Sequence, residues 1–123
     1  MTKTMKVLID LGFDNTITGT RIIEQAVLLA AEDPSLDRSV SERLYILAAE
    51  AIGANPDSVG RCLRYAMQKA KERGWESRLE KVEAKYGIFG LSDEMITPSG
   101  YTSPKKLILK LAMALGESAA VEV

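Results

Sequence analysis

Apolar residues recur three and four positions apart in each long apolar segment of this chain, which is the spacing of one face of an α-helix. Alternation of apolar and polar residues, as in a half-buried strand, extends over no more than a few positions. The chain also has no internal repeat. The pattern predicts an all-α fold of about six helices, in which the 123 residues form one domain around one modest core.

Glycine, proline and capping residues indicate where these helices begin and end. Asn55 suits an N-cap and Pro56 a first helical position, while Gly53 suits the left-handed residue that ends a helix. Ser39 and Glu42 form a capping box that predicts a helix start. The predicted helices cover about residues 3–11, 21–32, 39–52, 55–73, 76–86 and 103–115. Residues 87–103 are expected to form a long loop with one helical turn at most, and 117–123 a frayed tail.

The apolar faces of these helices predict the core. Tyr45 and Trp75 are expected inside the core or at its edge. The expected core positions of the four strongest helices are Ile22, Ile23, Ala26, Val27, Ala30, Leu44, Leu47, Ala48, Ala51, Ile52, Val59, Cys62, Leu63, Ala66, Met67, Ala70, Leu107, Ile108, Leu111, Ala112 and Leu115.

The segment around "IGANPDSVGRCLRYA" predicts a helix-turn-helix. Such a unit needs a small residue in its first helix, a residue tolerant of positive φ in the turn, and apolar residues in its second helix. Ala49, Gly53, Val59 and Cys62 meet these needs at offsets 0, +4, +10 and +13, the spacing of the bacterial repressor type. Ordinary packing at a corner between two helices is the alternative interpretation of the same spacing.

The second helix of this unit carries a basic face on a chain whose net charge is only −1. Between Val59 and Trp75 there are five arginines and lysines against Glu72 alone. The candidate DNA-binding residues are Ser58, Gly60, Arg61, Arg64, Tyr65, Gln68, Lys69 and Lys71. Arg61 and Arg64 would contact base edges or phosphates, and the backbone contacts would be supported by Tyr65, Gln68, Lys69 and Lys71. A basic face that is merely solvated is the alternative.

Composition argues against an enzyme. The chain has no histidine and one cysteine, so the commonest general base, a Cys/His zinc site and an internal disulfide are all excluded. No glycine-rich phosphate loop is present, and we expect no catalytic residue, no metal, no cofactor and no small-molecule ligand. The start, "MTKTMKVLIDLGF", is not typical of a signal peptide, and no apolar run reaches the ~20 residues of a membrane span. We therefore expect a cytoplasmic protein without membrane contact.

Residues 39–74 resemble, without a gap, the C-terminal DNA-binding effector domain of stage 0 sporulation protein A, a transcription factor that controls entry into sporulation. The matching residues or types are Ser39, Val40, Leu44, Tyr45, Ala49, Val59, Arg61, Arg64, Ala66, Arg73 and Gly74, with Ile17, Gly19, Ile23, Ala26 and Val27 upstream. The helix of Leu107 to Leu115 resembles the family's closing helix. The resemblance implies a six-helix domain whose fourth helix enters the major groove. It also implies transcription regulation at promoter boxes on double-stranded DNA, often by two copies on tandem sites, with Arg61 and Arg64 at DNA-contacting positions.

The chain departs from the family at several positions of the unit. Ser58 stands where the family typically has arginine, Gly60 where it has glutamate, and Tyr65 where it usually has histidine. Lys71 and Ile46 replace a tryptophan and a common proline. Both family residues at 58 and 60 help to read bases, so direct readout there is lost or transferred. A protein-interaction module that keeps the fold without base readout is therefore the alternative function.

The sporulation regulator also has a phosphorylatable receiver domain before its effector domain. About a dozen residues precede the first strong helix here, so we expect no receiver in this chain. Accordingly, Asp10, Asp14 and Asp33 are not expected to be phosphoacceptors.

Overall fold

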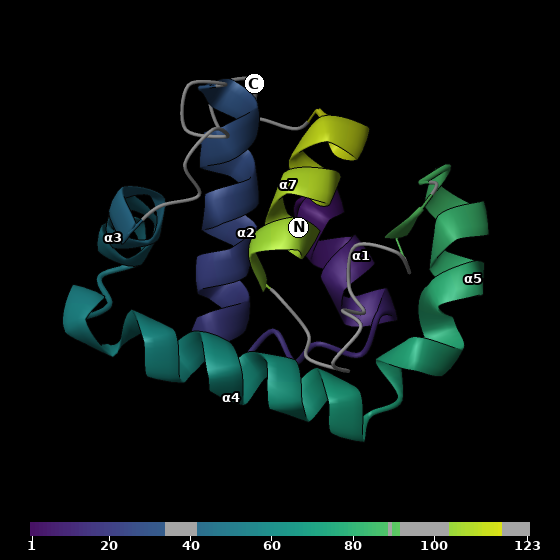
Figure 1. The fold of residues 1–123 in the computed structure, drawn as a ribbon, viewed down its shortest axis with the longest axis horizontal. Coiled ribbons are helices and arrows are strands. Elements are labelled where there is room, and N and C mark those ends of the chain that lie inside the picture. The colour runs from purple at the N-terminus through teal and green to yellow at the C-terminus, as the bar shows by residue number, and fades with distance from the viewer. Residues whose placement is uncertain (34–41, 89, 92–103, 117–123) are drawn as a thin grey trace.

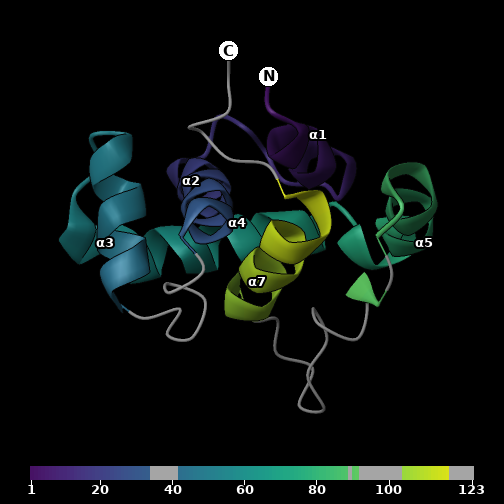
Figure 2. The ribbon, with the colours of Figure 1, turned by 90° about the horizontal axis from the view of Figure 1, so that it is seen from above.

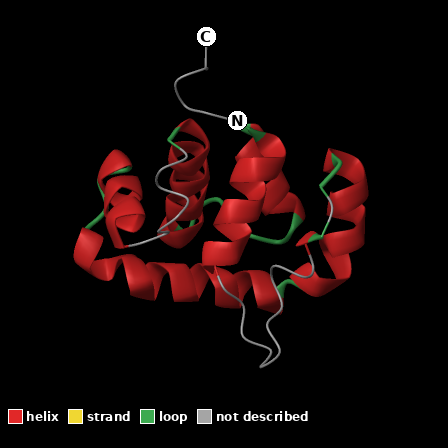
Figure 3. Cartoon of the chain, turned by 45° about the horizontal axis from the view of Figure 1, so that its top comes forward, coloured by secondary structure: helices red, strands yellow, loops and turns green. Residues whose placement is uncertain are grey.

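A computed structural model of the chain describes residues 1–33, 42–88, 90–91 and 104–116. The helices in these ranges are α1 (Lys3–Asp10), α2 (Thr18–Glu32), α3 (Glu42–Ala51), α4 (Val59–Glu72), α5 (Trp75–Tyr86) and α7 (Pro104–Leu115), with a short 3-10 turn η2 (Pro56–Ser58). The described part of the chain contains no strand, and short loops join many of its helices (Figure 3). The all-α prediction is confirmed. None of the described helices is long and apolar enough to cross a membrane.

Helix α4 forms the base of the molecule, and the other helices stand along it (Figure 1). The central helix is α2, which rises from α4 and packs against α1, α3, α4 and α7. Seen from above, α3 and α5 lie toward opposite ends of α4 (Figure 2). One long side of α4 is therefore covered by the rest of the fold.

Burial explains why α2 occupies the centre. Its residues are buried over most of its circumference, including Ile22, Ile23, Ala26, Val27 and Leu28. A helix that is apolar on several sides is stable only when neighbours cover those sides. Helices α3, α4 and α7 each present a narrower buried stripe toward it.

The predicted core is largely confirmed, with corrections at helix ends. Ala51, expected in the core, is exposed, because it is the last residue of α3, where the chain turns away toward η2. Leu47, Ile52, Cys62 and Leu115 are half-buried rather than buried. Trp75 is buried and Tyr45 half-buried, as expected.

Within the predicted loop of residues 87–103, Ile88 and Leu91 are fully buried, so the core extends beyond the predicted core positions. The expected helix from Asn55 also begins differently, since the 3-10 turn precedes the α-helical start at Val59. The Ser39 end of the predicted capping box, residues 92–103 and the tail 117–123 lie outside the described residues.

Candidate nucleic-acid interface

The turn between α3 and α4 is held by its own backbone. Gly53 has a φ of 71°, the left-handed conformation expected from its position. The Ala54 N–H donates to the Ala49 carbonyl at 2.9 Å, which ties the turn back to α3. The Asn55 side chain accepts a hydrogen bond from the Asp57 N–H at 2.9 Å, as expected of a capping residue. These bonds define how α4 leaves α3.

Helix α4 is also fixed from behind, by a contact that the sequence reasoning missed. A β-carbon built on Gly19 would lie 2.0 Å from the Cys62 carbonyl oxygen and 2.8 Å from the Ala66 β-carbon. The start of α2 therefore lies directly against the backbone of α4, which only glycine permits. Two features of the sequence point to Gly19: it lies in the first turn of a strong helix, and it is one of the residues that match the family.

The opposite side of α4 faces solvent. Arg61, Arg64, Gln68 and Lys71 are exposed and share this side, whereas Val59, Leu63, Ala66, Met67 and Ala70 are buried. Tyr65 is 50% exposed and lies beside Arg61 and Gln68 by helical geometry. The structure thus brings together the predicted cationic side chains on one exposed face, which we call the α4 face.

Ser58 and Gly60 lie at the start of this helix. The Arg61 guanidinium donates to Ser58 Oγ at 3.1 Å through Nη2, so Ser58 orients the arginine; it caps no helical N–H. A β-carbon at Gly60 would meet no atom within 4 Å, and its φ is not positive. The fold therefore does not require glycine at residue 60.

Lys69 lies at the flank of the α4 face. Its Nζ is 3.3 Å from Glu72 Oε2 and 5.6 Å from the centre of the Tyr65 ring. Exposed ion pairs of this kind contribute little to stability, so Lys69 can exchange Glu72 for another anion at little cost in free energy. Among the predicted site residues Lys69 is the half-buried cation, while Arg61, Arg64 and Lys71 are exposed.

The C-terminal end of α4 is tied to the loop before α2. Arg73 Nη2 lies 3.2 Å from Asp14 Oδ2. Hydrogen bonds from the Thr16 side chain at 2.6 Å and its N–H at 2.9 Å lower the pKa of Asp14, and the charge of Arg73 adds to this. Arg73 therefore already has a carboxylate partner, unlike the exposed cations of the α4 face.

A hollow of about 480 Å³ lies where the start of α2 meets α4. It is lined by Thr16, Ile17, Thr18, Gly19, Arg61, Cys62 and Tyr65. Residues on the α4 face thus border a concave surface as well as the open helix. Within the described residues no group of histidine, cysteine and acidic side chains is arranged to hold a metal ion.

Comparison with known families identifies the chain's relatives. Residues 4–88, more than half of the chain, match the family described as sporulation initiation factor Spo0A C terminal. The match begins at the second residue of α1, includes α2 to α5 and ends at Ile88, before α7. No solved structure matches the chain. The family consists of DNA-binding transcription-factor domains and is not an enzyme family. The resemblance from Ser39 to Gly74 lies inside the matched range, and the chain belongs to the Spo0A C-terminal family.

Proposed function

We propose that the chain binds double-stranded DNA by placing the α4 face in the major groove. The observation that carries this proposal is the α4 face itself. It presents Arg61, Arg64 and Lys71 to solvent, while the other side of α4 is fixed by α2. An α-helix with its side chains is about 10–12 Å in diameter, which fits a major groove about 12 Å wide. The 14 residues of α4 make it about 21 Å long. Family membership supports the same class of ligand.

In this proposal the two arginines carry the recognition. Arg61 and Arg64 have guanidinium groups that can donate two parallel hydrogen bonds to guanine or to a phosphate. The bond from Arg61 to Ser58 limits the directions in which Arg61 can point. Gln68 lies farther along the same face and can pair with an adenine edge or a phosphate.

The other site residues would fix the helix on the DNA backbone. Lys71 and the Tyr65 hydroxyl can each donate to a phosphate, and Lys69 can do so once its contact with Glu72 breaks. The positive end of the α2 dipole borders the hollow beside Arg61 and Tyr65, which favours a phosphate there. Such contacts hold the register of the helix without reading sequence.

Specificity is expected to be reduced or altered at the start of α4. Ser58 is short and engaged with Arg61, and Gly60 has no side chain. A good bidentate base contact contributes about 1–3 kcal/mol of discrimination, so two missing readers broaden the set of recognised sequences. We propose semi-specific binding at promoter boxes, with two copies on tandem sites, as the means of transcription regulation.

Selection from random duplexes tests the proposal. The protein is incubated with a library of random double-stranded DNA, and the bound fraction is sequenced. A short enriched motif, repeated in tandem in the strongest binders, is the expected result. A protein-interaction module predicts instead that no duplex is retained in a salt-sensitive way and that the chain binds a protein partner without DNA.

A further inference from the structure

Helix α5 separates its charges by side. Helical spacing places Arg78, Lys81 and Lys85 along one edge of the helix. Glu76, Glu80 and Glu83 lie on the opposite edge. Oppositely charged residues that stabilise an exposed helix usually lie three or four positions apart, and Arg78 and Lys81 have no acidic residue at those spacings. The basic edge is therefore not explained by pairing within the helix.

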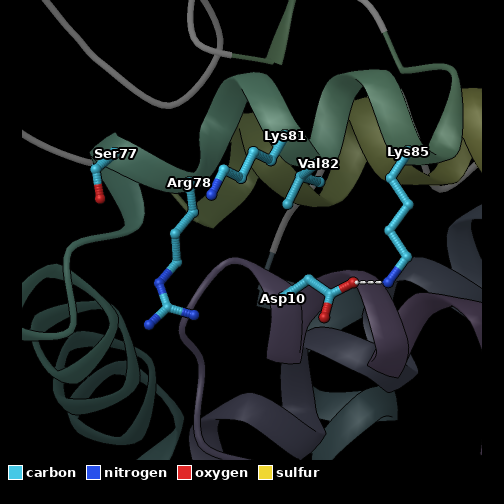
Figure 4. Close-up of a pocket in the computed structure, with 6 residues that line it drawn as sticks. All are labelled: Asp10, Ser77, Arg78, Lys81, Val82 and Lys85. Carbon is cyan, nitrogen blue, oxygen red and sulfur yellow. Dashed lines mark hydrogen bonds and ion pairs between the residues drawn. The ribbon is translucent and has the colours of Figure 1, made fainter.

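This basic edge lines a groove between α1 and α5 (Figure 4). The groove has a volume of about 450 Å³ and is lined by Asp10, Ser77, Arg78, Lys81, Val82 and Lys85. Arg78 and Lys85 extend from α5 toward α1 on either side of Asp10, and the amine of Lys81 lies on the Arg78 side. A pocket of 300–1,000 Å³ is typical of small-molecule sites.

The single carboxylate of the groove is already engaged. Asp10 Oδ2 accepts hydrogen bonds from the Tyr86 hydroxyl at 2.6 Å and from Lys85 Nζ at 2.9 Å. These two bonds, Tyr86 first, lower the pKa of Asp10. Arg78 and Lys81 form no ion pair with another described residue. Three cations face one carboxylate, so the groove carries an excess of two positive charges.

The position of the groove separates it from the α4 face. A β-carbon at Gly12 would lie 3.5 Å from the Ala70 carbonyl oxygen and 3.8 Å from Arg78 Cδ. Because Ala70 belongs to the buried side of α4, the stem of Arg78 lies behind that helix. Helix α5 also rises from α4 on the same side as α2 and α7 (Figure 1). The α4 face and the groove therefore lie on different sides of α4.

We infer that the groove between α1 and α5 binds the phosphate group of a small phosphorylated molecule. A phosphomonoester carries close to two negative charges at neutral pH, which matches the excess charge. Arg78 offers a planar fork for two phosphate oxygens, and Lys81 offers a third donor. A bound phosphate would also relieve the repulsion of Arg78, Lys81 and Lys85, which are three and four positions apart. The inference does not depend on DNA binding.

Titration with inorganic phosphate and inorganic pyrophosphate tests the inference. Backbone amide shifts of Ser77 to Lys85 are followed by NMR, with sodium chloride of equal ionic strength as the reference titration. The wild-type chain should show saturable shifts with both phosphates but not with chloride. In Arg78→Gln with Lys81→Gln the affinity should fall at least about tenfold, since hydrogen bonds to charged groups are lost.

The control is Lys105→Gln with Lys106→Gln, which removes two exposed positive charges from α7. It should keep phosphate affinity within about twofold of the wild type, and thermal unfolding should confirm that both variants fold. Absence of saturation in the wild type, or equal loss in both variants, would overturn the inference. A second measurement compares the affinity of the wild type and of Arg78→Gln with Lys81→Gln for a DNA duplex. If this variant loses duplex affinity and the wild type shows no saturable phosphate binding, the groove contacts the DNA backbone and the small-molecule assignment is wrong.

Discussion

Gly19 lies against the Cys62 carbonyl so closely that a β-carbon on residue 19 would be 2.0 Å from that oxygen. The contact joins the start of α2 to the middle of α4, and backbone atoms cannot yield as a flexible side chain can. Gly19→Ala should therefore push α2 away from α4 and destabilise the fold by about 1–3 kcal/mol or more. Urea unfolding followed by fluorescence of the single tryptophan, the buried Trp75, measures the change.

Gly60→Ala is the matched control for this substitution. It places alanine in the first turn of α4, as Gly19→Ala does in the first turn of α2, but its β-carbon meets no atom within 4 Å and its backbone is not left-handed. It should stabilise the chain by up to about 1 kcal/mol, the difference in helix propensity. A Gly19→Ala midpoint equal to or above that of the wild type would show that α2 does not depend on this close approach.

The start of α4 provides a test of specificity. Ser58→Arg with Gly60→Glu introduces the two side chains that are typical of the family at these positions. The open space at residue 60 admits glutamate without displacing the fold. We expect the motif selected from random duplexes to become narrower, with about tenfold stronger discrimination at each newly read position. An unchanged motif would mean that neither residue reaches the bases in this chain.

Asp10 should contribute to stability in a pH-dependent way. Hydrogen bonds from Tyr86 and Lys85 lower its pKa below the ordinary value of 3.8. A carboxylate with a lowered folded-state pKa stabilises the fold above its unfolded pKa, and the stabilisation is lost as pH falls through the lowered value. Wild-type stability should therefore decrease as the pH falls below about 4, with Asp14 adding to the decrease.

Asp10→Asn should remove part of that acid dependence. At pH 7 it should destabilise the chain by about 1 kcal/mol, a modest amount because the Asp10 side chain is 34% exposed. Glu80→Gln, which removes an exposed carboxylate from the other edge of α5, is the control and should change little. Parallel stability curves for Asp10→Asn and the wild type between pH 2 and 7 would show that the Asp10 bonds do not stabilise the fold.

Local features of the structure could be predicted from the sequence, because short-range chemistry determines them. The spacing of apolar residues predicted the helices. The left-handed backbone at Gly53 was predicted because glycine adopts positive φ without a steric cost. The cap at Asn55 was predicted because its side-chain oxygen can accept a hydrogen bond from a backbone N–H. The exposed position of Arg61 and Arg64 followed from the buried stripe on the other side of α4. These inferences need only residues within one or two helical turns of each other.

Contacts between distant segments could not be predicted in the same way. The approach of Gly19 to Cys62 and the bond between Asp10 and Lys85 join residues 43 and 75 positions apart. Their geometry depends on how whole helices pack, which periodicity does not specify. The burial of Ile88 and Leu91 was missed for a related reason, since glycines on either side of Ile88 suggested a loop while tertiary packing draws both residues into the core.

Lys71 should contribute electrostatically and without sequence preference. A phosphate contact releases counterions, so Lys71→Gln should weaken binding to all duplexes similarly and reduce the slope of log affinity against log salt by about 1. Fluorescence anisotropy of a labelled duplex at several salt concentrations measures this slope. A loss confined to one sequence would instead assign Lys71 to base readout.

The most direct test of DNA binding by the α4 face is an anisotropy titration of Arg61→Gln with Arg64→Gln at low salt. The control is Lys3→Gln with Lys6→Gln, which removes the same charge from exposed positions on α1. With helix content unchanged by circular dichroism, we expect the α4 variant to lose duplex affinity on the order of 100-fold and the control only a few-fold. Equal affinity of the α4 variant and the wild type, or equal losses in the two variants, would contradict recognition of DNA by this face.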